Sequence, residues 1–311
     1  MTVAFAFVIA ACALGAAAII ARSLADWLPA ARIMDGPVPG FQDRAVPRGG
    51  GLAIVVPLLL LAWLILPKDD VACRRMLIPL AAATGIAAIS LLDDIRTVAV
   101  PVRLAIHVAM AVGTIAVLGP IQSISAGPLG TLHLGAVAWP FSLLWIVGLT
   151  NAFNFMDGID AIAGITATVA GGAVAIASWL VGELHVSALS LVFATASLGF
   201  LTANWPPARI FMCDVGSTFC GFLLATLPLM ASADNEPRLT LIVALAASPF
   251  LLDTAITLAQ RLLRGDNVFQ PHRRHLYQRL VLAGWPHATV SCVYGGLAAA
   301  AAALGIFLTR S

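Results

Sequence analysis

Five aspartates of the chain stand in short polar motifs between long apolar runs, where acids are rare and usually functional. They are Asp93, Asp94, Asp157, Asp160 and Asp214. One acid at a helix end can be explained as a cap, but five on one side of a membrane would repel one another without a neutralising partner. Magnesium is commonly held by carboxylates together with substrate phosphates. The acids therefore predict a site for a metal-bound, phosphorylated substrate.

The first motif is Leu91-Leu92-Asp93-Asp94-Ile95-Arg96, at the end of an apolar run. Adjacent residues of a helix point about 100° apart. Both acids can serve one site only at a frayed helix end, or if they divide the tasks.

The second motif runs from Asn151 to Asp160. Its polar residues recur every three positions, at Asn151, Asn154, Asp157 and Asp160, so neighbouring members share a helical face. Gly158 predicts a break or tight turn within it. Amides and acids in this order suit contacts with hydroxyls, amides and a metal.

The third motif, Ile210-Phe211-Met212-Cys213-Asp214-Val215-Gly216-Ser217, precedes another apolar run. Ser217 is predicted to cap the following helix, whose first N–H groups favour a phosphate. Asp214 would then hold the associated cation, and Phe211 could stack on a base.

Two further motifs are basic. His272-Arg273-Arg274-His275 offers arginine forks that match phosphate oxygens, although a contact with anionic lipids is the alternative. Arg48 opens Arg48-Gly49-Gly50-Gly51, whose glycines allow a close approach to a ligand or, alternatively, to a neighbouring helix.

The elements that position these motifs are membrane helices. Of 311 residues 60% are hydrophobic and only 10% are charged, and the mean hydropathy is +0.97. A crossing helix needs about 20 mostly apolar residues. The sequence predicts an all-α integral membrane bundle of about ten such helices, at 3–21, 50–66, 76–92, 102–118, 136–150, 159–181, 186–203, 217–231, 238–260 and 289–308. The apolar body suggests that one substrate carries a long hydrocarbon tail.

The basic residues predict the orientation of the bundle. With both chain ends outside, the cytoplasmic loops hold Arg22, Arg32, Arg44, Arg48, Arg96, Arg103, Arg209, Arg261, Arg264, Arg273, Arg274 and Arg279. The opposite side holds only Lys68, Arg74, Arg75, Arg238 and Arg310. The positive-inside rule favours this topology, which also places the five aspartates on the cytoplasmic side.

Several classes of function and site are disfavoured. A net charge of +2 with scattered basic residues argues against nucleic-acid binding. The five cysteines show no CxxC spacing, so neither zinc nor a disulfide framework is expected. Four histidines, His107, His133, His185 and His287, stand alone on apolar stretches and are assigned no function.

Taken in order, these motifs resemble those of the polyprenyl-phosphate N-acetylhexosamine-1-phosphate transferases, over about residues 32 to 280. The resemblance implies a single domain, 1–311, with a cytoplasm-facing cleft in the bacterial inner membrane. It implies transfer of a sugar phosphate from a UDP-N-acetylhexosamine to undecaprenyl phosphate with release of UMP, at the start of cell-surface glycan synthesis. The implied cofactor is magnesium, with manganese as the alternative; membrane lipids surround the protein, and a homodimer is left open.

The resemblance also assigns roles to residues. Asp214 and Asp94 would be metal ligands, and the catalytic group would be Asp93, Asp94, Asp157, Asp214 and His272. Substrate contacts would come from Arg48, Asn154, Asp160, Asn204, Phe211, Arg273, Arg274 and His275, with Asn204 and Phe211 at the uridine.

Three departures from the family pattern matter. Cys213 stands where the family usually has glycine. The basic loop has two arginines between its histidines instead of the three consecutive histidines of the peptidoglycan branch, which disfavours the muramyl-pentapeptide nucleotide as donor. The stretch Gly40-Phe41-Gln42-Asp43-Arg44-Ala45 replaces a serine- and histidine-containing segment.

Two other functions are alternatives to this interpretation. An intramembrane prenyltransferase also uses paired acids to hold magnesium and a diphosphate, but it does not explain the third motif or the basic loop. A secondary transporter would place its acids near the membrane midplane, often between structural repeats. Here the acids are predicted on one side, and no repeat is evident.

Overall fold

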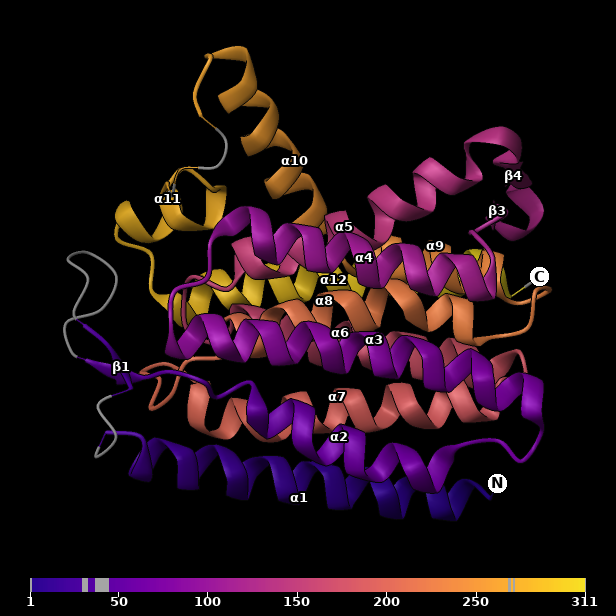
Figure 1. Cartoon of the computed structure of the whole chain (residues 1–311), viewed down its shortest axis with the longest axis horizontal. Coiled ribbons are helices and arrows are strands. Elements are labelled where there is room, and N and C mark those ends of the chain that lie inside the picture. The colour runs from indigo at the N-terminus through magenta and orange to yellow at the C-terminus, as the bar shows by residue number, and fades with distance from the viewer. Residues whose placement is uncertain (1, 30–32, 37–44, 268–269, 271, 311) are drawn as a thin grey trace.

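Long helices run roughly side by side along the molecule in the computed structural model, which describes residues 2–29, 33–36, 45–267, 270 and 272–310 (Figure 1). The stretch Gly40–Arg44, together with Arg32, lies outside the described residues. The helices are α1 (Val3–Trp27), α2 (Leu52–Ile65), α3 (Asp70–Ile95), α4 (Val100–Leu118), α5 (Ala138–Met156), α6 (Ile162–Leu180), α7 (Leu184–Asn204), α8 (Cys213–Met230), α9 (Glu236–Ala246), α10 (Ser248–Leu263), α11 (Leu276–Leu282) and α12 (His287–Thr309).

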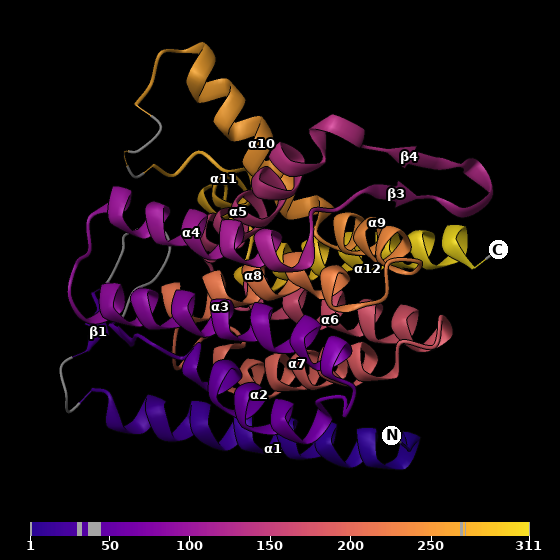
Figure 2. The ribbon, with the colours of Figure 1, turned by 45° about the vertical axis from the view of Figure 1, so that its right-hand side comes forward.

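Short strands and turns complete the fold. β1 (Met34–Asp35) pairs antiparallel with β2 (Val46–Pro47), and β3 (Ser123–Ser125) pairs antiparallel with β4 (Thr131–His133). Two 3₁₀ turns, η1 (Gly127–Leu129) and η2 (Gly135–Val137), flank β4. Figure 2 shows the β3–β4 hairpin projecting at the end of the bundle where α1 starts and α12 finishes.

The all-α membrane bundle expected from the sequence is confirmed, and each of the ten predicted runs is helical. The expected count of about ten crossing helices stays a prediction. Within the described ranges, eight helices are long and apolar enough to cross a membrane, or nine if α9 and α10 form one span. The short helix α2 has 14 residues, about 21 Å at 1.5 Å per residue, which is less than the hydrocarbon core.

The ninth predicted run is broken rather than continuous. α9 and α10 meet at an angle of 66°. Pro249 is the second residue of α10, and proline has no N–H group and clashes with the preceding turn of a helix. The break sends α10 away from the bundle, as Figure 1 shows.

Small residues let helices of the bundle approach closely, and α8 is the most enclosed of the candidate spans. On α1, Ala13, Ala17 and Ala21 are fully buried, and α1 packs along α7. α3 and α5 both pack along α8. Because α8 is surrounded, the motif at its start is held from several sides.

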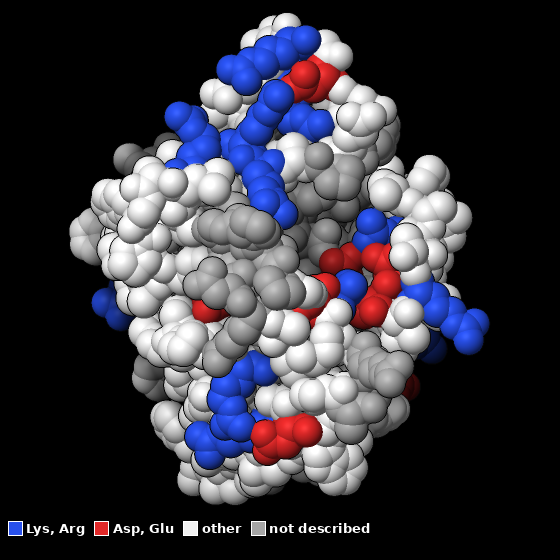
Figure 3. Space-filling view, turned by 90° about the vertical axis from the view of Figure 1, so that its left-hand side faces the viewer, with Lys and Arg blue, Asp and Glu red and all other residues white. Residues whose placement is uncertain are grey.

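The motif-bearing ends of α3, α5 and α8 lie at the end of the bundle that also carries β1 and α11 (Figure 1). Acidic and basic side chains gather on this face, around a hollow (Figure 3). The start of α1 and the end of α12 lie at the opposite end (Figures 1 and 2). The fold thus separates the polar motifs from both ends of the described chain.

Candidate active site

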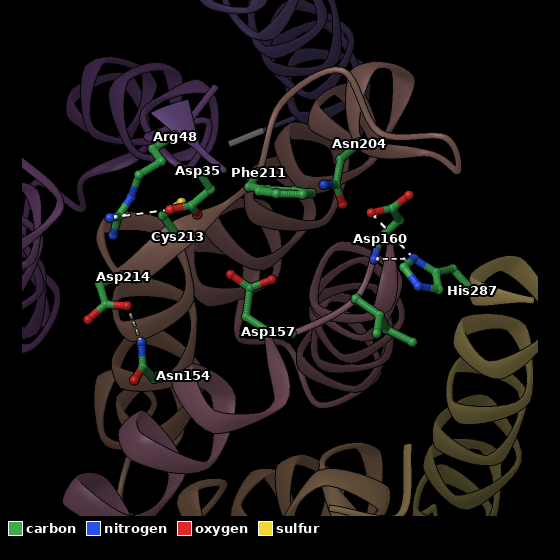
Figure 4. Close-up of a pocket in the computed structure, with 12 residues that line it drawn as sticks. Asp35, Arg48, Asn154, Asp157, Asp160, Asn204, Phe211, Cys213, Asp214 and His287 are labelled. Atoms are coloured by element: carbon green, nitrogen blue, oxygen red, sulfur yellow. Dashed lines mark hydrogen bonds and ion pairs between the residues drawn. The ribbon is translucent and has the colours of Figure 1, made fainter. Parts of the chain in front are cut away.

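A pocket of about 220 Å³ opens between the ends of α5, α8 and α12. It brings together side chains from all parts of the chain (Figure 4). Its lining residues are Asp35, Arg48, Asn154, Asp157, Gly158, Ile159, Asp160, Asn204, Phe211, Cys213, Asp214 and His287. Seven of the residues assigned roles from the sequence are therefore neighbours in space: Arg48, Asn154, Asp157, Asp160, Asn204, Phe211 and Asp214.

The first motif supports the third one directly. Asp94, at the end of α3, accepts hydrogen bonds from the backbone N–H groups of Asp214 at 3.2 Å and Val215 at 3.0 Å. Its side chain is 1% exposed and also pairs with Arg48 at 3.2 Å. A carboxylate at these first N–H groups caps α8 and opposes its positive dipole end.

This cap corrects the role predicted for Ser217. α8 begins at Cys213, four residues earlier than expected, so Ser217 lies in its second turn. The Ser217 hydroxyl donates to the Cys213 carbonyl and accepts from Asn154. Because Asp94 already occupies the N–H groups of Asp214 and Val215, these two groups are not available to a phosphate.

The glycine motif completes the frame around the start of α8. The N–H groups of Gly50 and Gly51 donate to the carbonyls of Phe211 and Met212 at 2.8 and 3.0 Å. A Cβ atom on Gly51 would overlap the backbone of Gly216. The close approach therefore joins two motifs, and it holds Arg48 beside Asp94.

Arg103 lies between the two remaining acids of this corner. Its Nη1 is 2.5 Å from Asp93 Oδ2 and also pairs with Asp214 Oδ2. The other oxygen of Asp214 accepts a hydrogen bond from the Asn154 amide at 2.8 Å. Asp93 further accepts from the Val98 N–H at 2.7 Å, which closes the turn between α3 and α4. Asp93 and Asp94 thus divide their tasks, one facing Arg103 and the other facing α8.

Asp157 stands in the middle of the pocket, directly after α5 (Figure 4). The predicted break in the second motif is confirmed, since α6 begins only at Ile162. No described arginine or lysine forms an ion pair with Asp157. Burial, followed by the negative charges of Asp214 and Asp94, raises the pKa of Asp157 well above its usual value.

The far side of the pocket carries Asp160 and His287. Asp160 Oδ2 accepts from the Ala208 N–H at 3.0 Å, and Asp160 Oδ1 lies 3.5 Å from His287 Nδ1. Both ends of the Asn204 amide are engaged by the backbone, at the Ala161 N–H and the Ile210 carbonyl, each at 2.9 Å. Asn204 therefore holds together the two loops that frame Phe211.

The basic loop from His272 to His275 does not line this pocket. His275 is buried, with its Nδ1 3.3 Å from Asp253 Oδ1, and it begins α11 through a capping box with Gln278. Arg274 pairs with Asp266, and the His272 ring lies 5.0 Å from that of His275. In this structure His275 makes structural contacts, and the direct substrate contact expected of it stays a prediction.

Asp253 ties this loop to the core. Its oxygens accept from the N–H groups of Leu276 and Tyr277, at 2.9 and 3.2 Å, and from the Tyr294 hydroxyl at 2.6 Å. The Tyr277 hydroxyl donates to the Phe155 carbonyl, beside Gly158. The segment that follows the basic loop therefore contacts the second motif through Tyr277.

Four residues of the site that carry a charged, imidazole or thiol side chain were not predicted as site residues from the sequence. They are Asp35, Arg103, Cys213 as a lining residue, and His287. His287 was assigned no function because it stands alone before an apolar run, and Arg103 was counted only as a topology signal. The position of Arg103 in the first turn of a membrane helix, ten residues after Asp93, is a signal that could have found it.

The donor set fits magnesium. Within the described part of the chain, no three His, Cys, Asp or Glu side chains already surround a common point as metal ligands. Magnesium does not require this, because it is usually held by one or two carboxylates plus substrate phosphates. Asp214 with Asp157, whose charges repel each other, provides such a pair next to Arg48.

Comparison with known proteins identifies this architecture. A family model described as glycosyl transferase family 4 matches residues 76–232, half of the chain. The chain belongs to glycosyl transferase family 4. The match contains the first three acidic motifs, and this membership decides against the prenyltransferase and transporter alternatives.

Individual relatives extend the similarity beyond the matched segment. The chain is 30% identical to the phospho-N-acetylmuramoyl-pentapeptide-transferase of Heliobacterium modesticaldum over 296 residues, 88% of this chain and 87% of the relative. It is 29% identical to the probable undecaprenyl-phosphate N-acetylglucosaminyl 1-phosphate transferase of Bacillus subtilis over 249 residues, 79% of this chain and 68% of the relative. The protein is thus similar to membrane sugar-phosphate transferases along most of its length.

Proposed function

We propose that this family 4 glycosyl transferase moves N-acetylhexosamine 1-phosphate from a UDP-sugar to undecaprenyl phosphate, in cell-wall or cell-surface glycan precursor synthesis. The names of the relatives support this reaction class. One observation carries the proposal: Asp214, Asp157 and Arg48 from three separate motifs meet in a single pocket at one end of a membrane bundle. A lipid phosphate and a soluble nucleotide can meet only at such a boundary.

The bound diphosphate requires positive charge. Magnesium, with manganese as the alternative, would be held by Asp214 and Asp157 and would neutralise phosphate oxygens, which makes the phosphorus easier to attack. Arg48, at the pocket wall, adds a fixed cation for the same oxygens. Asn154 fixes Asp214 through the hydrogen bond to its Oδ1.

The reaction is a direct displacement at phosphorus. An oxygen of the lipid phosphate forms a bond to the sugar-linked phosphorus, and the bond from that phosphorus to the bridging oxygen breaks, leaving UMP. A phosphate monoester with a second pKa of about 6 is already largely dianionic at pH 7. Proton removal by Asp93 therefore adds little, in keeping with its ion pair to Arg103.

Asp94 contributes by position rather than as a direct metal ligand. Its oxygens are engaged by Arg48 and by two N–H groups of α8. It therefore fixes the start of the helix that presents Asp214.

The uridine is proposed to lie on the opposite side of the pocket. Phe211 offers an aromatic face there, and Asn204 braces the loops on either side of it. Asp160 and His287 lie beyond Phe211, where they can contact hydroxyl or amide groups of the donor.

The proposed location is the bacterial inner membrane, with the pocket facing the cytoplasm. The arginine-rich loops of the predicted topology lie at the pocket end, whereas the start of α1 and the end of α12 lie at the other (Figure 1). Cytoplasmic UDP-sugars would then reach the pocket directly. Arg273 and Arg274 of the basic loop would bind phosphates at the rim of the pocket, and His272 would lie beside these arginines.

The test is an assay of the purified protein with undecaprenyl phosphate, magnesium and a panel of UDP-N-acetylhexosamines, reading UMP release and labelled lipid product. Asp214→Asn should lower the rate by about a thousandfold. Asp26→Asn is the matched control, because Asp26 is an exposed acid paired with Arg209 outside the pocket, and it should keep the wild-type rate. A folded Asp214→Asn protein with the wild-type rate, or no UMP release with any donor, would overturn the proposal.

A further inference from the structure

We propose that Arg103 is a placeholder for the divalent cation: it neutralises the acidic corner while the site is empty and leaves Asp214 when the cation binds. This inference rests on the proposed function, because it concerns the same metal. It goes further by assigning a role to a residue that no motif singled out.

The contacts of Arg103 carry this inference. A single guanidinium nitrogen lies against Oδ2 of Asp93 and Oδ2 of Asp214, which belong to the ends of α3 and α8. One cationic centre that bridges oxygens of two carboxylates reproduces the charge arrangement of a bridging metal ion. A divalent cation at Asp214 Oδ2 would compete directly with this nitrogen.

Only one oxygen of Asp214 takes part in the exchange. Its Oδ1 is held by the Asn154 amide at 2.8 Å, so the carboxylate stays in place when Oδ2 changes partner. Asp94 is already committed to Arg48 and to the backbone of α8, and it cannot replace Asp214 as the partner of Arg103 without uncapping that helix. Arg103 is therefore the group that moves.

Some polar atoms around Arg103 have no partner among the described residues. Its Nε is buried without a hydrogen-bond partner in the described part of the protein. His107, one helical turn later on α4, is 5% exposed, and neither of its ring nitrogens has a described partner either. Polar atoms left unpaired at a buried position are costly, which favours a change of partner at this corner.

Exchange also explains the charge balance of the corner. Arginine and a divalent cation close to the same carboxylate oxygen would repel each other strongly. Without either of them, Asp93 and Asp214 would be left to repel each other and Asp157. With a diphosphate present, the released guanidinium can neutralise phosphate oxygens.

The test is a titration of the purified protein with Mn²⁺ in the absence of nucleotide, following the free-ion signal by electron paramagnetic resonance. Arg103→Gln removes the charge and nearly keeps the length, and it should bind Mn²⁺ about tenfold more tightly than wild type. Arg103→Lys keeps the charge and should stay within about threefold of wild type. Arg209→Gln, which removes an exposed arginine paired with Asp26, should not change Mn²⁺ binding.

Equal or weaker Mn²⁺ binding by folded Arg103→Gln, with normal binding by wild type, would overturn the placeholder role and leave the proposed function standing. Absence of UMP release with every donor would instead contradict the proposed function.

A second measurement needs no variant. Phenylglyoxal modifies free arginines, and mass spectrometry can follow Arg103 against Arg209 as the internal reference. Mn²⁺ should accelerate modification of Arg103 severalfold in the wild-type protein. An unchanged ratio of the two rates would contradict release of Arg103.

Discussion

The acidic cluster (Asp93, Asp94, Asp157 and Asp214) and the basic loop (His272 to His275) lie at the same end of the bundle but use their polar groups differently. In the cluster, Asp157 and Asp214 line the pocket, whereas Asp94 accepts a hydrogen bond from the first turn of α8. In the loop, His275 is buried against Asp253, whereas Arg273 and Arg274 are exposed. In both regions one buried acid accepts hydrogen bonds from backbone N–H groups, and we propose that residues beside it bind the substrate.

The largest effect is expected at Asp94, the buried acid of the cluster. Asp94→Ala leaves Arg48 and two N–H groups of α8 without their partner, which should lower the free energy of unfolding by about 3–5 kcal/mol. UMP release should fall by about a thousandfold. Thermal unfolding in detergent and the UMP assay measure the two effects. Wild-type stability of Asp94→Ala would contradict the comparison, because Asp94 would then not stabilise the start of α8.

The matching acid of the loop is Asp253. Asp253→Ala removes the acceptor of the Leu276 and Tyr277 N–H groups and should lower the free energy of unfolding by about 3 kcal/mol. His275→Asn, which keeps a hydrogen-bonding group, should lower kcat less than Asp253→Ala while leaving KM for the UDP-sugar near wild type. A large rise of KM with unchanged stability in His275→Asn would show that the histidine contacts the substrate after all.

Arg274 tests whether the exposed part of the loop meets phosphates. Arg274→Gln should raise KM for the UDP-sugar about tenfold, the loss expected for one charged hydrogen bond. Stability should change by less than about 0.5 kcal/mol, because the Asp266 pair is half exposed. Asp266→Asn is the control, and a similar rise of KM in that variant would indicate that the ion pair, rather than a phosphate contact, matters.

A smaller effect is expected at Cys213, which adopts φ of +60° at the start of α8. This left-handed region favours glycine, the residue usual in the family at this position. Cys213→Gly should therefore raise the free energy of unfolding by up to about 1 kcal/mol and keep activity. Cys213→Val should lower both, since a β-branched residue disfavours positive φ. A lower free energy of unfolding in Cys213→Gly would mean that the contacts of the thiol stabilise the fold by more than the positive φ of Cys213 destabilises it.

The smallest effect concerns the pH dependence of stability. Burial, followed by the positive charges of Arg261 and other neighbours, lowers the pKa of His272 from 6.5 to about 4. Between these values the unfolded chain binds a proton that the folded protein does not, so stability should rise with pH across this window. Replacing His272 with glutamine should flatten that rise. An unaltered slope in unfolding experiments from pH 4 to 6.5 would place His272 in a more solvated setting.

The helices and most of the pocket could be predicted from the sequence because both depend on local patterns. The ten predicted apolar runs are all helical, although α11 was not among them. The spacing of Asn154 and Asp157 predicted a helical face, and Gly158 predicted the break after it. Asp157, Asp160 and Asp214 all line the pocket, which agrees with the prediction that these acids lie on one side of the bundle.

What the sequence left out depends on contacts between distant segments. The cap of α8 comes from Asp94, 120 positions away in the chain. The local pattern around α8 predicted Ser217 as the cap, because it contains no sign of so distant a partner. Likewise the contact between His275 and Asp253 joins residues 22 positions apart, and the motif alone does not predict it. His287 and Arg103 carry no motif, and only the packing of α12 and α4 brings them to the site.

The most direct test of the central claim is the binding of UDP to the purified protein with and without magnesium, by calorimetry. If a divalent cation lies between Asp214, Asp157 and the diphosphate, magnesium should tighten UDP binding to the wild type by at least about tenfold. Asp214→Asn should lose that gain while Asp26→Asn keeps it. Equal UDP affinity with and without magnesium in the wild type, or an undiminished gain in Asp214→Asn, would contradict the account.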